Sequence, residues 1–267
     1  VNGRYHVERS LGSGGFGRTY LVLDADSDNS QWVLKEFCPS ASQNEDALEK
    51  ARELFRREVE VLGKVDHPQV PALQGSFEWE ERLFLVQQYV EGETYWKRFR
   101  ENQSAGAPCN EAEVREMLTH MLPLLEELHR QKIYHRDITP DNIIKPKDGG
   151  KPVLIDFGAV KQKMTTLLAT GSDRAQASVI GKTGYASPEQ MRGMEPGPES
   201  DIYSLGATAL VLLTNREPEE LMDPMDLTWD WRSHCEVSDE LAAVLDQMVA
   251  DRPRDRYRNA GKILSQL

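Results

Sequence analysis

The sequence has little cysteine, and its histidines form no metal-binding pattern. The three cysteines among 267 residues are odd in number and far apart, so their spacing indicates neither a disulfide framework nor a metal site. The six histidines include no pair spaced as in H-E-x-x-H, which argues against a structural metal. These absences make a reducing, cytoplasmic location the expected one.

Long apolar runs and an excess of positive charge are also missing. No run reaches the roughly 18 residues of a membrane helix, and "LGATALVLLT" at 205–214 is better explained as a buried helix. The net charge of −12 argues against a nucleic-acid partner, whose phosphates attract basic surfaces. The first residues lack a signal-peptide pattern. A start at Val rather than Met suggests a piece of a longer chain that carries additional regulatory domains.

The composition, with 39% hydrophobic and 28% charged residues, is that of a globular protein with one large domain or two lobes. Strand-like segments dominate the first part, with one helix expected at 46–63. After "EGE" at 91–93 the patterns become helical, and Asn110 with Glu113 signals the start of a helix that continues through Pro123. The stretch 159–186 lacks periodicity, and a loop of that length is usually functional. Three later helices are expected at 200–214, 238–249 and 258–266.

The stretch "GSGGFG" at 12–17 fits both a dinucleotide-binding loop and a phosphate-covering turn. It is followed by "RTYLVLDA", which continues as a strand, whereas a dinucleotide fingerprint leads into a helix. The context therefore favours a turn between two strands. Lys35 lies in the strand-like "WVLKEF", and Glu58 lies on the apolar stripe of helix 46–63, where a carboxylate needs a partner. Taken alone, each could instead be an ordinary surface charge.

Two further motifs complete the pattern. "HRDITPDN" at 135–142 fits H-R-D-L-x-x-x-N with Ile in fourth place, and "IDFGAV" at 155–160 supplies D-F-G nineteen residues after Asp137. With these motifs in this order, the chain resembles the catalytic domain of a bacterial eukaryotic-like (Hanks-type) serine/threonine protein kinase. The resemblance implies an α+β, two-lobed kinase fold over residues 1–267. A strand-rich N-lobe would span about 1–88, a hinge about 87–92 and a helical C-lobe about 93–267, with an ATP cleft between the lobes.

The resemblance also implies roles for the motif residues. Asp137 would accept the proton of the substrate hydroxyl, and Lys35 would hold ATP phosphates while Glu58 holds Lys35. Asn142 and Asp156 would bind Mg²⁺ or Mn²⁺. Gln87 would be the gatekeeper of the adenine pocket, and Thr19 replaces a customary Val in its wall. The expected nucleotide-binding residues are Leu11, Gly12, Ser13, Gly14, Gly15, Phe16, Gly17, Thr19, Val33, Lys35, Ile144 and the backbone of Gln88 and Val90.

Later motifs resemble the family as well. "YASPEQ" at 185–190 is similar to the A-P-E element, with Ser187 in place of Ala. The resemblance implies that Asp201 of "SDIYSLG" braces the backbone of the catalytic loop. It also implies that Arg256 pairs with Glu189.

One part of the catalytic loop departs from the family. Thr139 stands where serine/threonine kinases carry a Lys, and Lys182 stands where the segment before A-P-E carries a Thr. We therefore expect that Lys182 and Thr139 have exchanged places and that the Lys182 ammonium stabilises charge on the transferring phosphoryl group. The alternatives are that Lys182 is a solvated lysine, or that Thr183 takes the usual Thr part after a one-residue shift.

The expected function is an ATP-dependent protein serine/threonine kinase that acts on protein substrates. In the family, Arg136 reads a phosphate on the activation segment, and we expect autophosphorylation between 165 and 178. A small-molecule phosphotransferase and a pseudokinase scaffold are the alternatives, and Pro140 favours Ser/Thr over Tyr specificity. The candidate acceptors are Thr165, Thr166, Thr170, Ser172 and Ser178.

Overall fold

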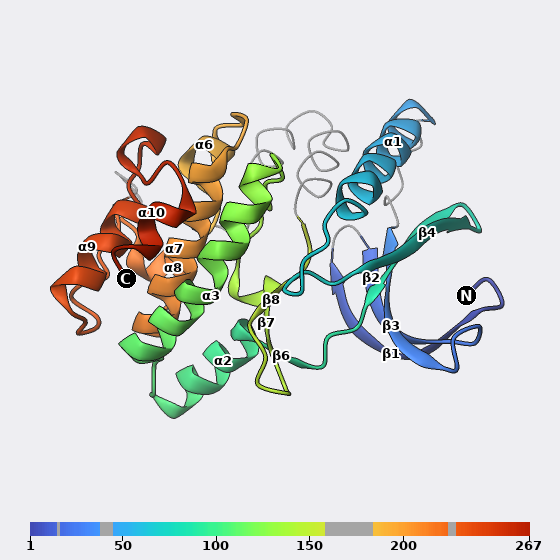
Figure 1. Ribbon diagram of the computed structural model, residues 1–267, viewed down its shortest axis with the longest axis horizontal. Coiled ribbons are helices and arrows are strands. Elements are labelled where there is room, and N and C mark those ends of the chain that lie inside the picture. The colour runs from blue at the N-terminus through green and yellow to red at the C-terminus, as the bar shows by residue number, and fades with distance from the viewer. Residues whose placement is uncertain (15–16, 38–44, 158–183, 224–227) are drawn as a thin grey trace.

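The computed structural model of the chain has two lobes joined after strand β5, a sheet-rich lobe and a mainly helical one (Figure 1). It describes residues 1–14, 17–37, 45–157, 184–223 and 228–267. Within helix α1, some of these residues are described by their backbone alone. The predicted α+β, two-lobed architecture is confirmed.

The smaller lobe is built on a five-stranded antiparallel sheet with the order β1-β2-β3-β5-β4. Its strands are β1 (Tyr5–Gly14), β2 (Gly17–Asp24), β3 (Ser30–Phe37), β4 (Leu73–Trp79) and β5 (Arg82–Gln88). The long helix α1 (Glu45–Leu62) packs on this sheet, where the Phe55 ring meets the Phe37 ring edge-on at 5.0 Å.

Strand β5 is buried on both faces, because successive side chains of a strand point to opposite sides. Leu83 and Leu85 join the large core that extends into the helical lobe, whereas Phe84 and Val86 join a second core on the other face of the sheet. A slip by one residue would move each set from its own core into the core on the other face, so packing specifies the register of β5 with β3.

Helix α7 (Pro198–Thr214) is the centre of the helical lobe, and all of its residues from Ser200 to Thr214 are buried. It packs against helices α3 (Glu111–Arg130) and α9 (Asp239–Met248). Gly206 allows the close approach of α9, since a Cβ there would lie 2.9 Å from the Met248 Cβ. The apolar run at 205–214 is therefore a core helix, as predicted, and none of the helices in the described ranges is long and apolar enough to span a membrane.

Helix α3 begins and continues as the sequence predicted. Asn110 and Glu113 form a reciprocal capping box, and the helix runs through Pro123 without ending. The remaining short elements surround α3 and α7. They are β6 (Gly92–Thr94), α2 (Tyr95–Ala105), η1 (Pro140–Asn142), β7 (Ile143–Pro146), β8 (Val153–Leu154), α6 (Pro188–Met191), α8 (Pro218–Leu221), η2 (Pro253–Asp255) and α10 (Ala260–Leu264).

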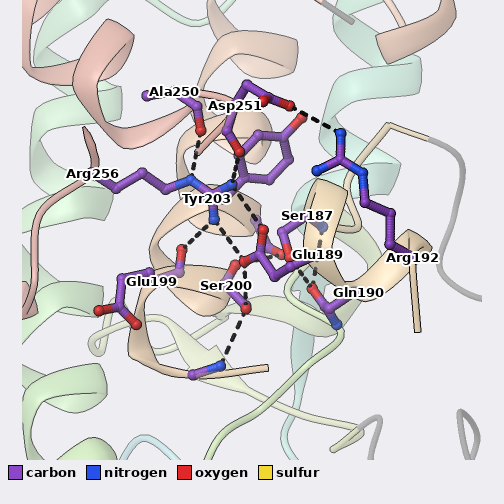
Figure 2. A network of polar contacts seen from close by, with 12 residues as sticks. Ser187, Glu189, Gln190, Arg192, Glu199, Ser200, Tyr203, Ala250, Asp251 and Arg256 are labelled. Atoms are coloured by element: carbon purple, nitrogen blue, oxygen red, sulfur yellow. Dashed lines mark hydrogen bonds and ion pairs between the residues drawn. The ribbon is translucent and has the colours of Figure 1, made fainter. Parts of the chain in front are cut away.

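Arg256 attaches helix α6 to the end of the helical lobe (Figure 2). Its Nη1 and Nη2 donate to the two carboxylate oxygens of Glu189 at 2.7 and 3.0 Å. Its other bonds go to the backbone carbonyls of Ala250 at 2.6 Å, Glu199 at 3.0 Å and Asp251 at 2.7 Å. All five N–H donors of the guanidinium are therefore used, and the expected pairing of Arg256 with Glu189 is confirmed.

The same ion pair is almost completely removed from solvent, with side-chain exposures of 0% for Arg256 and 6% for Glu189. Burial alone would raise the pKa of the Glu189 carboxyl, but the hydrogen bonds from Arg256 and Ser200 hold that pKa below its usual 4.5. The Tyr203 ring also lies against the guanidinium, with Cζ of Arg256 4.7 Å from the centre of the ring (Figure 2). Loss of either charge leaves the other one buried without a counter-charge, which destabilises the fold.

We predict that Glu189→Gln lowers the free energy of unfolding by about 3–5 kcal/mol, because it leaves a buried guanidinium without its counter-charge. Glu91→Gln, which breaks an exposed pair with Lys147, should cost less than about 1 kcal/mol. Urea unfolding measures both, and equal losses would contradict the prediction. Since the folded pKa of Glu189 is depressed, the stabilisation should be present above pH 4.5 and be lost as the pH falls through the folded pKa.

Candidate active site

A cavity of about 610 Å³ lies between the two lobes, a volume suited to a small ligand. Residues of β1 to β3 form one side, and residues 87–90 and 92–94 with Ile144 of β7 form the other. A second cavity of about 800 Å³, beside residues 88–91 and 146–151, shares Gln88 and Val90 with the first but is not lined by Lys35, Asn142 or Asp156. The predicted residues that line the first cavity are Leu11, Gly12, Thr19, Val33, Lys35, Gln87, Gln88, Val90, Asn142, Ile144 and Asp156.

The two ends of the Gly-rich segment belong to paired neighbouring strands, in agreement with the predicted context. Ser13 and Gly14 end β1, and Gly14 pairs with Gly17 at the start of β2. Gly17 has a φ of 152°, and a Cβ at this position would lie 1.8 Å from the carbonyl oxygen of Glu36, so glycine is required. Gly15 and Phe16 lie outside the described residues.

Lys35 lies on β3 and lines the cavity. Its Nζ donates to Oε1 of Gln87 at 2.6 Å and forms an ion pair with Asp156. The predicted partner, Glu58, belongs by its backbone to α1, but its side chain lies outside the described part of the structure. The Lys35–Glu58 pair therefore stays a prediction.

Asp201 holds the loop that carries Asp137. The carboxylate of Asp201 accepts hydrogen bonds from the backbone N–H groups of His135 at 2.9 Å and Arg136 at 2.8 Å, and from Nε2 of His129 at 2.8 Å. Arg136 adopts a φ of 69°, a conformation that is costly for a non-glycine residue and that the two backbone bonds stabilise. The expected bracing role of Asp201 is confirmed.

These contacts also set the charge of Asp201. Burial alone would raise the pKa of its carboxyl, but the hydrogen bonds from His129 and from the backbone N–H of Arg136 bring it below the usual value. The group is therefore ionised at neutral pH, and its charge assists the two backbone bonds.

The buried ring of His135 joins this loop to the D-F-G segment. Its Nε2 donates to the carbonyl oxygen of Ile155 at 3.0 Å, its Nδ1 accepts from the backbone N–H of Asp137 at 3.4 Å, and it packs on the Phe157 ring at 4.6 Å. Burial lowers the pKa of His135, which favours this neutral form.

Asp137 and Asn142 lie in direct contact. Nδ2 of Asn142 donates to the backbone carbonyl of Asp137 at 2.7 Å and to its Oδ2 at 3.0 Å. The amide oxygen Oδ1 of Asn142 is thus the atom left for a cation. Asp156, with a φ of 60°, brings a carboxylate to the same cavity. One carboxylate and one amide oxygen fit Mg²⁺ bound together with phosphates better than a metal held by protein alone.

Thr139 is buried, and its carbonyl oxygen accepts from the backbone N–H of Asn142 at 2.9 Å at the start of η1. Lys182, Thr183 and the candidate phosphorylation sites at 165–178 lie outside the described residues. The exchange of Thr139 with Lys182 therefore remains a prediction.

Several cavity residues were missed by the sequence reasoning. The contact of Gln87 with Lys35 was not predicted, although Gln87 was expected to line the adenine pocket. Arg9 lies on β1 and Asp141 lies within the motif at 135–142, whereas Glu93, Thr94 and Lys97 follow the hinge and belong to no motif. A weak signal existed in Thr94, which caps helix α2 and accepts from the backbone N–H of Lys97 at 3.1 Å. The lining residues that were not predicted are Arg9, Pro71, Tyr89, Gly92, Glu93, Thr94, Lys97, Asp141 and Ile155.

Comparisons with known proteins agree with this geometry. A family model described as "Protein kinase domain" matches residues 5–266. Serine/threonine-protein kinase B of Synechocystis sp. and PknA of Nostoc sp. are each 38% identical over the full chain, which covers 46% and 47% of their lengths. The chain thus spans about half the length of these relatives. The solved apo form of PpkA-294 is 24% identical, with a TM-score of 0.82 over 99% of this chain and 96% of that one.

We predict that Asp201→Asn releases the loop. An amide retains only one oxygen, so an N–H of His135 or Arg136 loses its acceptor, at a cost of about 1.5–3 kcal/mol in the free energy of unfolding. Hydrogen–deuterium exchange should become faster at these two amides before it does so in the core of α7. Asp230→Asn, which changes an exposed carboxylate that accepts from Ser233, is the matched control. Unchanged protection at residues 135 and 136 would contradict the bracing role.

Proposed function

Because this chain belongs to the protein kinase domain family, we propose that it transfers the γ-phosphoryl group of ATP to serine or threonine hydroxyls of protein substrates. The observation that carries the proposal is the convergence of Lys35, Asn142 and Asp156 at one cavity, with Asp137 bonded to Asn142. The names of the relatives support serine/threonine specificity. Pro140, at the first position of η1, matches the loop pattern of such enzymes.

Each residue has a part that its surroundings support. Asp137 accepts the proton of the attacking hydroxyl, and Asn142 fixes the orientation of its carboxylate through the 3.0 Å bond. Lys35 binds phosphate oxygens within the cavity. Asn142 and Asp156 would hold Mg²⁺, which neutralises charge that develops on the phosphates. The walls formed by Leu11, Thr19, Val33, Ile144 and the hinge backbone would take the adenine.

We predict that Asp137→Asn and Asp156→Ala fail in different ways. Loss of the base should lower the rate of transfer to casein or myelin basic protein on the order of 10²-fold or more, while ATP still binds. Loss of Asp156 should remove the Mg²⁺ dependence of ATP binding. Radiolabel transfer and equilibrium binding measure the two effects, and mass spectrometry of residues 165–178 reports autophosphorylation. Equal transfer by the wild type and Asp137→Asn would overturn the kinase proposal.

We further propose that Lys182 supplies the positive charge that Lys supplies at position 139 in related enzymes. Thr139 carries no charge and is buried beside the base, so a cation for the transferring phosphoryl group must come from another segment. The reciprocal occurrence of Thr139 and Lys182 in the sequence supports this exchange.

Lys182→Met should lower kcat on the order of 10²-fold, as for other lost transition-state donors, with little change in the KM for ATP. The double variant Thr139→Lys with Lys182→Thr should be more active than either single variant, because the two positions would act on the same charge. Steady-state kinetics of the four proteins measures this coupling. A near-normal kcat for Lys182→Met would show that the lysine is solvated or that Thr183 takes the usual part.

A further inference from the structure

Gln87 and Lys35 face the same cavity from neighbouring strands. The β3–β5 register places Val33 opposite Gln87 and Lys35 opposite Leu85. Because side chains two residues apart share a face of a sheet, Val33, Lys35 and Gln87 all point to one side. Gln87 is the diagonal neighbour of Lys35, a separation that a long side chain can bridge.

The contact between these two side chains is short and sheltered. Nζ of Lys35 lies 2.6 Å from Oε1 of Gln87, and Gln87 is only 4% exposed. A buried amide oxygen without a donor is costly, and a bond from a charged donor is stronger than one between neutral groups. The lysine and the amide therefore orient one another.

The second acceptor of Lys35 has a competing task. Asp156 forms an ion pair with Lys35 and is also a candidate metal ligand. A divalent cation would compete with the ammonium for the same carboxylate. The side-chain amide of Gln87 is neutral and belongs to the same sheet as Lys35. It can therefore continue to bind the ammonium when Asp156 binds a cation.

We propose that Gln87 is a positioning residue for Lys35: its amide oxygen keeps the Lys35 ammonium directed toward the phosphate end of the cavity. This inference rests on the proposed function, in which Lys35 binds ATP phosphates. Gln87 would thereby contribute to the affinity for the phosphate part of the nucleotide without contacting it.

The test compares ATP with adenosine, which has the same base and ribose but no phosphates. Equilibrium binding of each is measured, with Mg²⁺ present, for the wild type, Gln87→Met, Lys35→Met and the double variant. Gln87→Met has a similar length but lacks the acceptor. It should weaken ATP binding about tenfold more than it weakens adenosine binding. In the Lys35→Met background the same change should have no further effect on ATP, since the group that it positions is gone.

Two controls separate positioning from a change in pocket shape. Gln87→Leu removes the same acceptor with a different shape and should give the same selective loss for ATP. Gln31→Met alters an exposed β3 glutamine that bonds to Glu8, and it should change neither ligand. Adenosine binding also verifies that each variant is folded.

The inference is overturned if Gln87→Met weakens ATP and adenosine equally, or if its effect on ATP persists without Lys35. Normal ATP binding by Lys35→Met would overturn the assigned role of Lys35 and this inference together. A weakened Lys35→Met beside an unaffected Gln87→Met would overturn the positioning role alone and leave the proposed function standing.

Discussion

The site depends on one carboxylate, on the buried helix α7, that accepts hydrogen bonds from the loop that precedes Asp137. Asp201 accepts from two successive backbone N–H groups, those of His135 and Arg136. Successive N–H groups turn toward one anion when one of the residues is left-handed, and Arg136 is the residue that takes this conformation. Because α7 is buried on every side, the carboxylate has little freedom to move. The loop therefore inherits the rigidity of the core rather than the mobility of a surface turn.

From this anchor a chain of contacts reaches the other lobe. The ring of His135 connects the loop to Ile155 by a hydrogen bond to its backbone carbonyl. The next residue, Asp156, forms an ion pair with Lys35 on β3. Lys35 in turn meets Gln87 on β5, whose register is specified by burial on both faces. At the cavity the two lobes are thus joined by charged and polar groups, which a ligand can rearrange, while the large apolar core also continues from β5 into the helical lobe.

Much of the fold and part of the site could be predicted because the relevant signals are local. The apolar run 205–214 and the capping residues of α3 are contiguous in the chain, and they predict elements that the structure contains. The contact of Lys35 with Gln87 could not be predicted, because the residues are 52 positions apart and the contact depends on strand register. The pairing of Arg256 with Glu189 was foreseen only through the family resemblance, since no periodicity relates positions 67 residues apart.

The complete use of the Arg256 donors has a consequence for how this part of the chain can vary over generations. A lysine at position 256 would keep the positive charge but offer three donors in place of five. Two buried acceptors would then be left without a hydrogen-bond donor. A neutral residue would strand the Glu189 carboxylate as well. A change at either position alone is therefore expected to be destabilising, so the two positions should change together.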